Sequence, residues 1–450
     1  MVQVIKKSYL IALALGLGLV LALLALLGGG LIARAAPVAE LHVCPSGCTY
    51  SSIQDAVDAA ETGDVIKVAQ GTYTDMHHIA SLDTAEFTAT QIAAITKSIT
   101  LQGGYSTANW NVPDPQAHPT ILDAGGFGRV LVISGTINPE IDGFQITGGN
   151  SQGLGGSGSL DVGGGIIIHG ASPTIKNNNI SGNSTQYRGG GLYLFLSPAI
   201  LSGNTIGSNT TRYRGGGVSS YSSLVTLSGN TFENNTAEDQ GDGQGGGLYL
   251  TGLGGTLNSN VFVGNQAESG GGVFMLYVYG PKPTLINTAL VGNQALEGSG
   301  IWFGGNKYST IDTIRSLHTT LHDNGGGGAG IFVGEYASFA MTNTIISSHT
   351  VGISVTFGST TTLDSTLWYA NPTNLAGSVT HSSDYSGNPD FGVDGYHIGS
   401  NSAALDKGVS VSVTADIDGE RRPQGGGYDI GADEYDLLDI FLPMVVKKYP

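Results

Sequence analysis

Short runs of alternating apolar and polar residues fill most of the chain, and they recur at a nearly constant spacing. Each unit opens on a glycine triplet. The last glycine of the triplet falls at Gly165, Gly191, Gly217, Gly247 and Gly272, with looser versions ending at Gly300 and Gly330. Alternating apolar residues follow each triplet, for example Leu192 and Leu194, and this period of two is typical of a β-strand. The pattern predicts a repeat of short strands, with one unit every 25 to 30 residues.

Asparagines mark the second half of each unit and form two sets that follow the same period. The first set is Asn178, Asn204, Asn230, Asn260 and Asn287, and the second is Asn183, Asn209, Asn235, Asn265, Asn293 and Asn324. Asparagine tolerates the left-handed backbone region, and its side-chain amide can bond to an identical residue stacked above it. We therefore expect each set to form a ladder through coils stacked about 4.8 Å apart.

The lengths of the segments decide the fold class. Helical solenoids do not fit, because the segments are too short and too rich in Gly and Thr. Two or three short strands per unit instead predict an all-β solenoid, a single parallel β-helix, over residues 161–385, with its first coils in residues 36–160. Inward Ile, Leu, Val and Phe side chains would form a continuous core, and glycine would permit positive φ angles at the corners.

One helix is expected near the start of the solenoid. Ser51 or Ser52 can cap a helix that runs through Ala60, and Ile53 and Val57 belong to its apolar face. A strand, Val65 to Val68, follows after a Gly-Asp turn. A short amphipathic helix ahead of many strands can close the open end of a solenoid, so we predict an N-terminal helical cap.

The sequence changes character in its last part. Residues 386–435 no longer follow the repeat and end in "ADIDGERRPQGGGYDIGADEY", which we interpret as a separate C-terminal capping module. The tail, residues 436–450, is apolar and then basic, and it is too short to span a bilayer.

The acidic run of the module, Asp416, Asp418 and Glu420, resembles a Ca²⁺-binding loop. We favour a structural role instead, because an arginine fork can lock such a module through a carboxylate. The expected partners are Arg421 or Arg422 on one side and Asp429 or Asp433 on the other.

The N-terminus, residues 1–35, is predicted to be a signal peptide. Lys6 and Lys7 form a positive region, the run from Tyr9 to Leu27 is apolar, and an A-x-A site predicts cleavage before Ala36. The apolar run is long for a signal peptide, so an uncleaved membrane anchor is the alternative. In both cases the rest of the chain is exported.

The chain has two cysteines, Cys44 and Cys48. Export makes a disulfide across this short loop the expected state, with two free thiols as the alternative. A metal site is not expected here, because no second pair of Cys or His residues follows at ligand spacing.

Charge narrows the choice of partners. The formal net charge is −17, and only 12% of the residues are charged. Nucleic acid is excluded as a partner, because phosphate contacts need clustered cations. The composition suits neutral glycans, or polyanions bridged by a divalent cation.

The repeat resembles the right-handed parallel β-helix proteins of the pectin-lyase-like superfamily. "IQDAVDAAETGDVIKVAQGTYTD" looks like their first turn and cap, and "IDGFQITGGN" like an early coil. The final "DIDGERRPQGGGYDIGADEY" resembles the signature of the bacterial choice-of-anchor Q type of exported protein. The resemblance implies a right-handed helix and a protein that is extracellular or on a bacterial cell surface. The superfamily includes polysaccharide lyases, hydrolases, epimerases and members without assigned activity, so it implies little about chemistry.

Two Tyr-Arg pairs are the first candidate site. Tyr187-Arg188 and Tyr213-Arg214 are 26 residues apart and should stack on neighbouring coils. Tyrosine rings suit sugar rings, and paired arginines attract an anion. The functional interpretation is a strip that contacts glycans, with Arg188 or Arg214 as a candidate catalytic base; the alternative is a pair of solvent-facing turn residues.

The next coil carries an acidic insertion, "AEDQGDGQ", with Glu238, Asp239 and Asp242. Carboxylates on a flexible loop suit Ca²⁺, so these three are candidate ligands, although a solvated acidic loop fits as well. Paired aspartates on successive coils, which a hydrolase would need, do not occur in the repeat.

These observations support three functions. The first is an exported surface protein that binds glycans or mediates adhesion without catalysis. The second is a polysaccharide lyase or epimerase that acts on acidic sugars with Ca²⁺. The third is a structural spacer of the cell envelope, and in each case a membrane is contacted only through an uncleaved N-terminal segment.

Overall fold

The structure is a computed structural model that describes residues 38–80, 87–238, 241–279, 282–305 and 313–435. The expected signal segment and the tail lie outside the described residues. All the helices and strands described below belong to one compact unit, which begins at Ala39. No helix in the described part of the chain has the length and apolarity needed to cross a bilayer.

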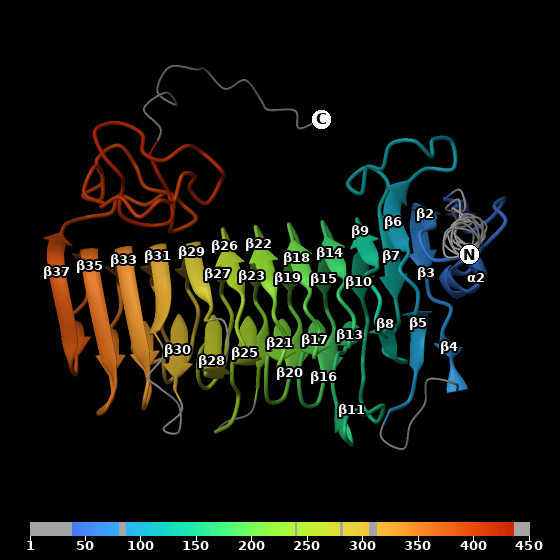
Figure 1. Cartoon of the computed structure of the whole chain (residues 1–450), viewed down its shortest axis with the longest axis horizontal. Coiled ribbons are helices and arrows are strands. Elements are labelled where there is room, and N and C mark those ends of the chain that lie inside the picture. Colours follow the sequence, from blue (N-terminus) through green and yellow to red (C-terminus); the bar gives the residue numbers. More distant parts are fainter. Residues whose placement is uncertain (1–37, 81–86, 239–240, 280–281, 306–312, 436–450) are drawn as a thin grey trace, which may run out of the picture. The chain divides into compact units, whose positions relative to one another are not determined.

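Strands one repeat apart pair side by side, so equivalent residues of successive coils are neighbours. In the first sheet, the lower one in Figure 1, Leu192 pairs in parallel with Val218, and Val218 with Leu248. Among the strands that the structure describes, only β4 joins this sheet antiparallel. The strands of the first sheet are β4 (His77–His78), β5 (Thr90–Ile95), β8 (Arg129–Ser134), β13 (Ile166–His169), β17 (Leu192–Phe195), β21 (Val218–Tyr221), β25 (Leu248–Leu253), β28 (Val273–Tyr279), β30 (Ile301–Gly304), β32 (Ile331–Val333), β34 (Val351–Val355) and β36 (Thr373–Ala376).

The second sheet holds the strands that flank the asparagine positions. Its early members are β1 (Glu40–Val43), β2 (Val65–Ala69), β3 (Gly71–Tyr73), β6 (Thr100–Tyr105), β7 (Thr120–Asp123), β9 (Glu140–Asp142) and β10 (Gln145–Thr147). The repetitive coils add β14 (Thr174–Lys176), β15 (Asn179–Ser181), β18 (Ile200–Ser202), β19 (Thr205–Gly207), β22 (Thr226–Ser228), β23 (Thr231–Glu233), β26 (Thr256–Asn258) and β27 (Val261–Val263). The last coils add β29 (Thr284–Val291), β31 (Thr313–His322), β33 (Ser338–Ser347), β35 (Thr360–Tyr369) and β37 (Val379–Ser386).

Two small sheets complete the strands. A hairpin joins β11 (Gly156–Ser157) to β12 (Leu160–Asp161), and a third parallel stack consists of β16 (Ser184–Thr185), β20 (Thr210–Thr211) and β24 (Thr236–Ala237). The third stack lies on the turn that leads into the glycine triplets, which is where the candidate site residues are.

The interior is one hydrophobic cluster shared by the coils. Leu192 and Leu194 are fully buried in it, whereas Tyr193 between them packs in a separate cluster on the other face of the strand. The same interior cluster extends from Val43 to Trp368. The predicted alternation and the all-β solenoid with a continuous core are confirmed.

The glycine triplet is needed for its small size as well as for its backbone freedom. Gly189 has a φ of 67°, and a Cβ added to it would lie 2.2 Å from the carbonyl oxygen of Leu192. A Cβ on Gly190 would meet the carbonyl oxygens of Thr210 and Gly216 at 2.4 and 2.5 Å. Side chains therefore do not fit at this corner without moving backbone atoms of the same coil, for Gly189, or of the next coil, for Gly190.

The second asparagine ladder forms as expected. Both the backbone N–H and the Nδ2 of Asn209 donate to Oδ1 of Asn235, at 3.1 and 3.0 Å, and Nδ2 also donates to the carbonyl of Ile180. The same pattern links Asn183, Asn209, Asn235, Asn265, Asn293 and Asn324. The left-handed conformation falls on the residue before each ladder position, such as Ser208 with a φ of 51°, and not on the asparagine itself as expected.

The ladder continues past the predicted residues through a histidine. Nδ2 of Asn324 lies 3.1 Å from Nε2 of His349, and the backbone N–H of His349 donates to Oδ1 of Asn371. His349 is 1% exposed, and burial lowers the pKa of its imidazole to about 4. It is thus a neutral acceptor that stands in the ladder where an asparagine would fit.

The prediction that Asn287 belongs to the first ladder is wrong. Oδ1 of Asn260 accepts from Asn230 in the expected way, but the pairing of β27 with β29 places Thr288 on the next rung. Asn287 lies one residue earlier, in the left-handed corner with a φ of 47°. From there on the rung positions are Thr288, Thr319, Thr344 and Thr366.

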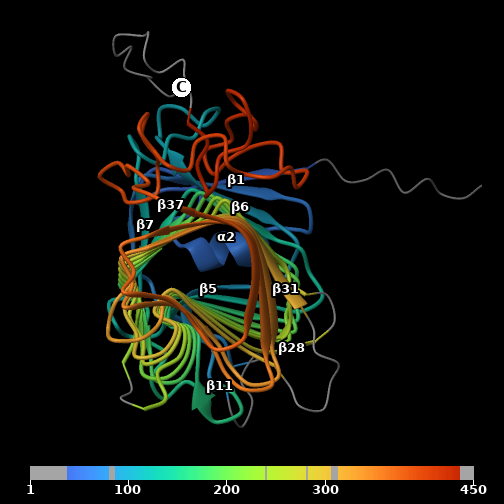
Figure 2. The same cartoon turned by 90° about the vertical axis from the view of Figure 1, so that its left-hand side faces the viewer.

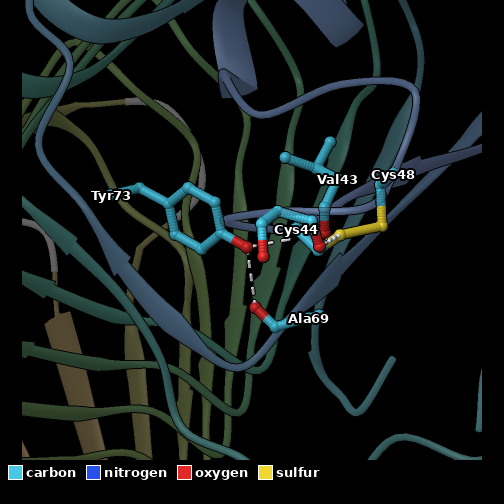
Figure 3. Close-up of a disulfide and its surroundings, with 6 residues drawn as sticks. Val43, Cys44, Cys48, Ala69 and Tyr73 are labelled. Atoms are coloured by element: carbon cyan, nitrogen blue, oxygen red, sulfur yellow. Dashed lines mark hydrogen bonds between the residues drawn. A yellow bond between two sulfur atoms is a disulfide. The ribbon is translucent and has the colours of Figure 1, made fainter. Parts of the chain in front are cut away.

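The N-terminal end is closed by the expected helix, α2 (Ile53–Ala59), which is capped by the Ser52 hydroxyl accepting from the backbone N–H of Asp55. In Figure 2, which looks along the coils, α2 lies across the space that they surround, and its Ile53 and Val57 belong to the interior cluster. Cys44 and Cys48 form a disulfide at this N-terminal end of the β-helix (Figure 3).

The C-terminal module, which follows β37, packs against the side of the second sheet. Figure 1 shows it above β29 to β35. Asn343 donates to the carbonyl of Val409 and accepts from its N–H, at 2.7 and 2.8 Å, and Asn287 donates to the carbonyl of Ala415. Most side chains of β37 remain exposed. The module therefore covers the flank of the last coils, and its described residues leave the face of the final coil open.

A buried ion pair locks the module, but with a different partner from those expected. Nη1 of Arg422 lies 2.7 Å from Oε2 of Glu434, and both side chains are fully buried. Asp429 instead accepts from the backbone N–H groups of Asp406 and Tyr435, and Asp433 accepts from that of Ile398. The expected structural role of this region is present, while the pairing of Arg422 with Asp429 or Asp433 is not.

Candidate functional site

The two Tyr-Arg pairs stack on neighbouring coils. The ring centroids of Tyr187 and Tyr213 lie 5.1 Å apart, with an interplanar angle of 15°. The backbones of Arg188 and Arg214 pair in a parallel β-bridge. All four side chains are half-buried. The turn that carries them is held by β16 and β20 immediately before it and by the glycine triplet after it.

The guanidinium groups lie on aromatic rings of the next coil. Cζ of Arg188 is 5.3 Å from the ring centroid of Tyr221, and Cζ of Arg214 is 5.5 Å from that of Tyr249. Each arginine therefore covers the outer surface of the first sheet through a cation–π contact. Both arginines thus lean onto the following coil, and they keep the one-coil spacing that the sequence predicts.

The acidic insertion contacts Arg214. Oδ1 of Asp242 lies 3.6 Å from Nη2 of Arg214 and accepts from Nε2 of Gln244. Asp239 lies outside the described residues, so the proposed set of three Ca²⁺ ligands is seen only in part. Among the residues that the structure describes, Glu238 and Asp242 do not belong to a cluster of three metal-ligand atoms.

A polar groove opens on the same turn, one to four coils beyond Tyr213 and Arg214. Its volume is about 510 Å³, and the exposed side chains of Gln266 and Gln294 lie on it in register, because their backbones bridge one another. The groove is lined by Thr236, Ala237, Glu238, Gly241, Gln266, Ala267, Glu268, Gln294, Ala295, Leu296 and Gly326. The two glutamines were not predicted as site residues, although the repeated "NQA" after Asn265 and Asn293 could have indicated them.

An aromatic column extends the surface along the first sheet. Tyr249, Phe274, Trp302 and Phe332 stack in that order, with centroid distances of 5.4, 4.2 and 6.0 Å. The first two rings are buried beneath the turn, while Trp302 and Phe332 are half-buried. The column was missed in the sequence because its members occupy the outward position of strands whose inward residues carry the period-two signal.

A second polar cluster lies in the C-terminal module. Asp394 and Asp418 each place a carboxylate oxygen 2.5 Å from a ring nitrogen of His397. The hydrogen bond to Asp418 is the largest of the effects that raise the pKa of His397 to about 10, and burial raises the pKa of the nearby Asp433 to about 6. The sequence gives no periodic signal for this cluster, since its members come from three separate turns.

Comparison with known proteins supports the architecture. Residues 161–295 match the family model described as right handed beta helix region. The chain is a right-handed β-helix. This β-helix is similar to the crystal structure of pectate lyase Pel9A over 89% of its own length and 98% of that chain, with a TM-score of 0.52 and 12% sequence identity. At that identity the similarity concerns the fold alone. No curated protein matches the sequence.

Proposed function

We propose that this β-helix is an exported bacterial surface protein, of the choice-of-anchor Q type, that binds glycans without transforming them. The proposal rests on one observation: the stacked rings of Tyr187 and Tyr213 and the polar groove beside Gln266 and Gln294 share one turn of successive coils. Aromatic faces pack against the apolar faces of sugars, and amide and carboxylate groups hydrogen-bond to sugar hydroxyls.

The stacking of the coils suits a linear polymer. Equivalent side chains recur about every 4.8 Å along the axis, so a glycan chain laid along the turn would meet the tyrosines, the insertion and then the glutamines. Each coil would contribute a small number of contacts, and the total affinity would grow with the number of coils engaged.

Charge favours a neutral glycan over an acidic one. Glu238 and Glu268 line the groove, and Arg214 is already paired with Asp242. Carboxylates facing a uronic acid would repel it. The alternative of a lyase or epimerase draws less support for the same reason, because one of its two candidate bases is engaged in an ion pair.

A glycan array tests the proposal. The purified chain should bind neutral glycans, and the double variant Tyr187→Ala/Tyr213→Ala should bind them at least about tenfold more weakly, as expected for the loss of two stacking contacts. Gln266→Ala should have a smaller effect. The matched control is Tyr369→Ala, which removes a tyrosine that is 39% exposed on β35 and should leave binding unchanged.

Two results would speak against the proposal. One is a wild-type chain that binds no glycan on the array, which would favour the spacer. The other is the appearance of unsaturated sugar ends, followed by absorbance, when uronic acid polymers and Ca²⁺ are added. Turnover that is lost in Arg214→Ala would establish the lyase.

A further inference from the structure

The cluster around His397 brings together three metal-ligating side chains from three turns of the C-terminal module. His397, Asp418 and Asp433 each offer one ligand atom, and these atoms all lie within 4.8 Å of one another. The imidazole is half-buried, Asp418 is exposed and Asp433 is buried. A single ion between them would be reachable from solvent on one side and enclosed by protein on the other.

Neighbouring groups orient each of the three side chains. Asp394 holds Nδ1 of His397, which turns Nε2 towards Asp418. Oδ2 of Asp433 accepts from the backbone N–H of Ile398 at 2.7 Å. A carboxylate on the far nitrogen of a histidine is the usual partner of a histidine that binds a metal.

The charges in the cluster do not balance. Three carboxylates, those of Asp394, Asp418 and Asp433, face one imidazole. The buried cation of the module, Arg422, is paired with Glu434. Asp433 is 6% exposed, accepts one hydrogen bond and forms no ion pair with a described residue. Three carboxylates therefore share the positive charge of one imidazole, and such an excess of partly buried negative charge is costly, which points to a further positive ligand.

We propose that His397, Asp418 and Asp433 bind a divalent transition-metal ion, with Zn²⁺ as the best fit. One imidazole and two carboxylates form a borderline ligand set, which suits Zn²⁺, whereas Ca²⁺ prefers oxygen ligands only. Three protein ligands leave a fourth position for water. The ion would join the turn at His397 to the Asp416–Glu420 turn and to the segment that carries Glu434, and would thereby stiffen the module on the flank of the second sheet.

Metal titration of the untagged full chain tests the proposal, after treatment with a chelator. Calorimetry should show one Zn²⁺ bound per chain, with Ca²⁺ binding at least about 100-fold more weakly at this site. His397→Gln and Asp433→Asn should abolish Zn²⁺ binding. Asp394→Asn, which removes only the group that orients the imidazole, should weaken it by about 10- to 100-fold.

The chain offers a matched control. Nδ1 of His381 lies 2.6 Å from Oδ2 of Asp384, with the same spacing of three residues as Asp394 and His397, but no third ligand joins that pair among the described residues. His381→Gln should leave Zn²⁺ binding unchanged.

The wild-type protein alone can overturn the proposal, so it does not depend on whether the variants fold. X-ray absorption of the Zn²⁺-loaded chain should show one imidazole nitrogen and otherwise oxygen ligands. A folded chain that binds no Zn²⁺, a spectrum without imidazole nitrogen, or equal loss of binding in His381→Gln would each refute it.

Discussion

Two stretches of the second sheet have different residues at the equivalent corner of their coils, which is the position of the first ladder. In the coils from Asn178 to Asn260 the rung is asparagine, and the strands on either side are three residues long, as in β14 and β15. From Thr288 onwards the rung is threonine, and β29 is one strand of 8 residues while β31, β33 and β35 have 10.

The difference arises from the group that accepts the hydrogen bond of the rung residue's backbone N–H. The N–H of Asn178 donates to the side chain of Asn204, so the side chain replaces a link in the backbone ladder. Threonine cannot reach the next rung in this way, and the backbone pairing skips only the corner residue Asn287 before it resumes between Thr288 and Thr319. The comparison shows that one side-chain amide decides whether the sheet is broken at its corner.

The residue before each rung differs as well. It is left-handed in both stretches: it is Asn177, Gly203 and Gly229 in the coils away from the C-terminal module, and Asn287, His318 and Asn343 under it. A corner that carries a polar side chain offers donors and acceptors to the module, whereas a glycine corner offers none. Asn287 and Asn343 use this position to bond to the module, whereas Asn177, in the equivalent position away from the module, donates to Asp142.

The largest expected effect comes from removing a rung. Asn230→Ala would delete the bonds of Nδ2 to Leu201 and Asn260 and leave the donors of Asn204 unpaired, which should lower the free energy of unfolding by roughly 3 kcal/mol. Thr344→Val, at the same corner, removes a buried hydroxyl that has no partner and should change it by less than about 1 kcal/mol. Urea unfolding measures both. Similar losses in the two variants would contradict the contrast between the rungs.

The next effect depends on pH and concerns His349 in the second ladder. Its folded pKa is about 4, below the ordinary value of 6.5. At neutral pH neither state binds the extra proton; between about 6.5 and 4 the unfolded chain binds it and the folded chain does not. The histidine therefore lowers the free energy of unfolding as pH falls, by up to about 1.4 kcal/mol per pH unit.

His349→Asn should remove this contribution, because an amide can fill the rung without titrating. The advantage of the variant over the wild type should grow as urea unfolding is repeated from pH 7 to pH 5. A difference between the two proteins that stays constant with pH would show that His349 is not the titrating group.

The smallest effect tests the docking corner. Asn343→Ala removes both bonds to Val409 and the contact with Nε2 of His318, and should speed hydrogen exchange in residues 404–432 by about tenfold. The control is Asn177→Ala, which removes a left-handed asparagine whose Nδ2 donates to Asp142, away from the module. Equal protection of the module in all three proteins would mean that Asn343 does not hold it.

The sequence predicted those features that repeat. The core alternation and the second ladder follow from spacing, because residues one period apart come into contact when the coils stack. The helix after Ser52 does not repeat and follows instead from its capping serine and its apolar face. Asn287 was misplaced because "LINT" sets its asparagine one residue closer to the leucine than "LSGN" does. Features that depend on non-repeating tertiary contacts could not be predicted from the sequence. Examples are the ion pair of Arg422 with Glu434 and the packing of the module on the flank of the second sheet.

The candidate site likewise has features that the sequence predicts and features that it does not. The stacking of Tyr187 on Tyr213 follows from the 26-residue period, whereas the resting of each arginine on a ring of the next coil depends on side-chain direction. The groove could not be predicted, because it depends on the exposed side chains of Gln266 and Gln294. A pattern of apolar residues does not indicate which polar side chains of a turn are exposed.

The asparagine ladder also governs how the chain can change in length. Asn183, Asn209 and Asn235 are 26 residues apart, so the loss or duplication of one whole coil would give each rung an equivalent new neighbour. A change of a few residues within the ladder corner would instead misalign the rungs. We therefore expect related chains to differ by complete coils in this stretch, each adding or removing about 4.8 Å of the solenoid's length, while the flank that carries the module stays intact.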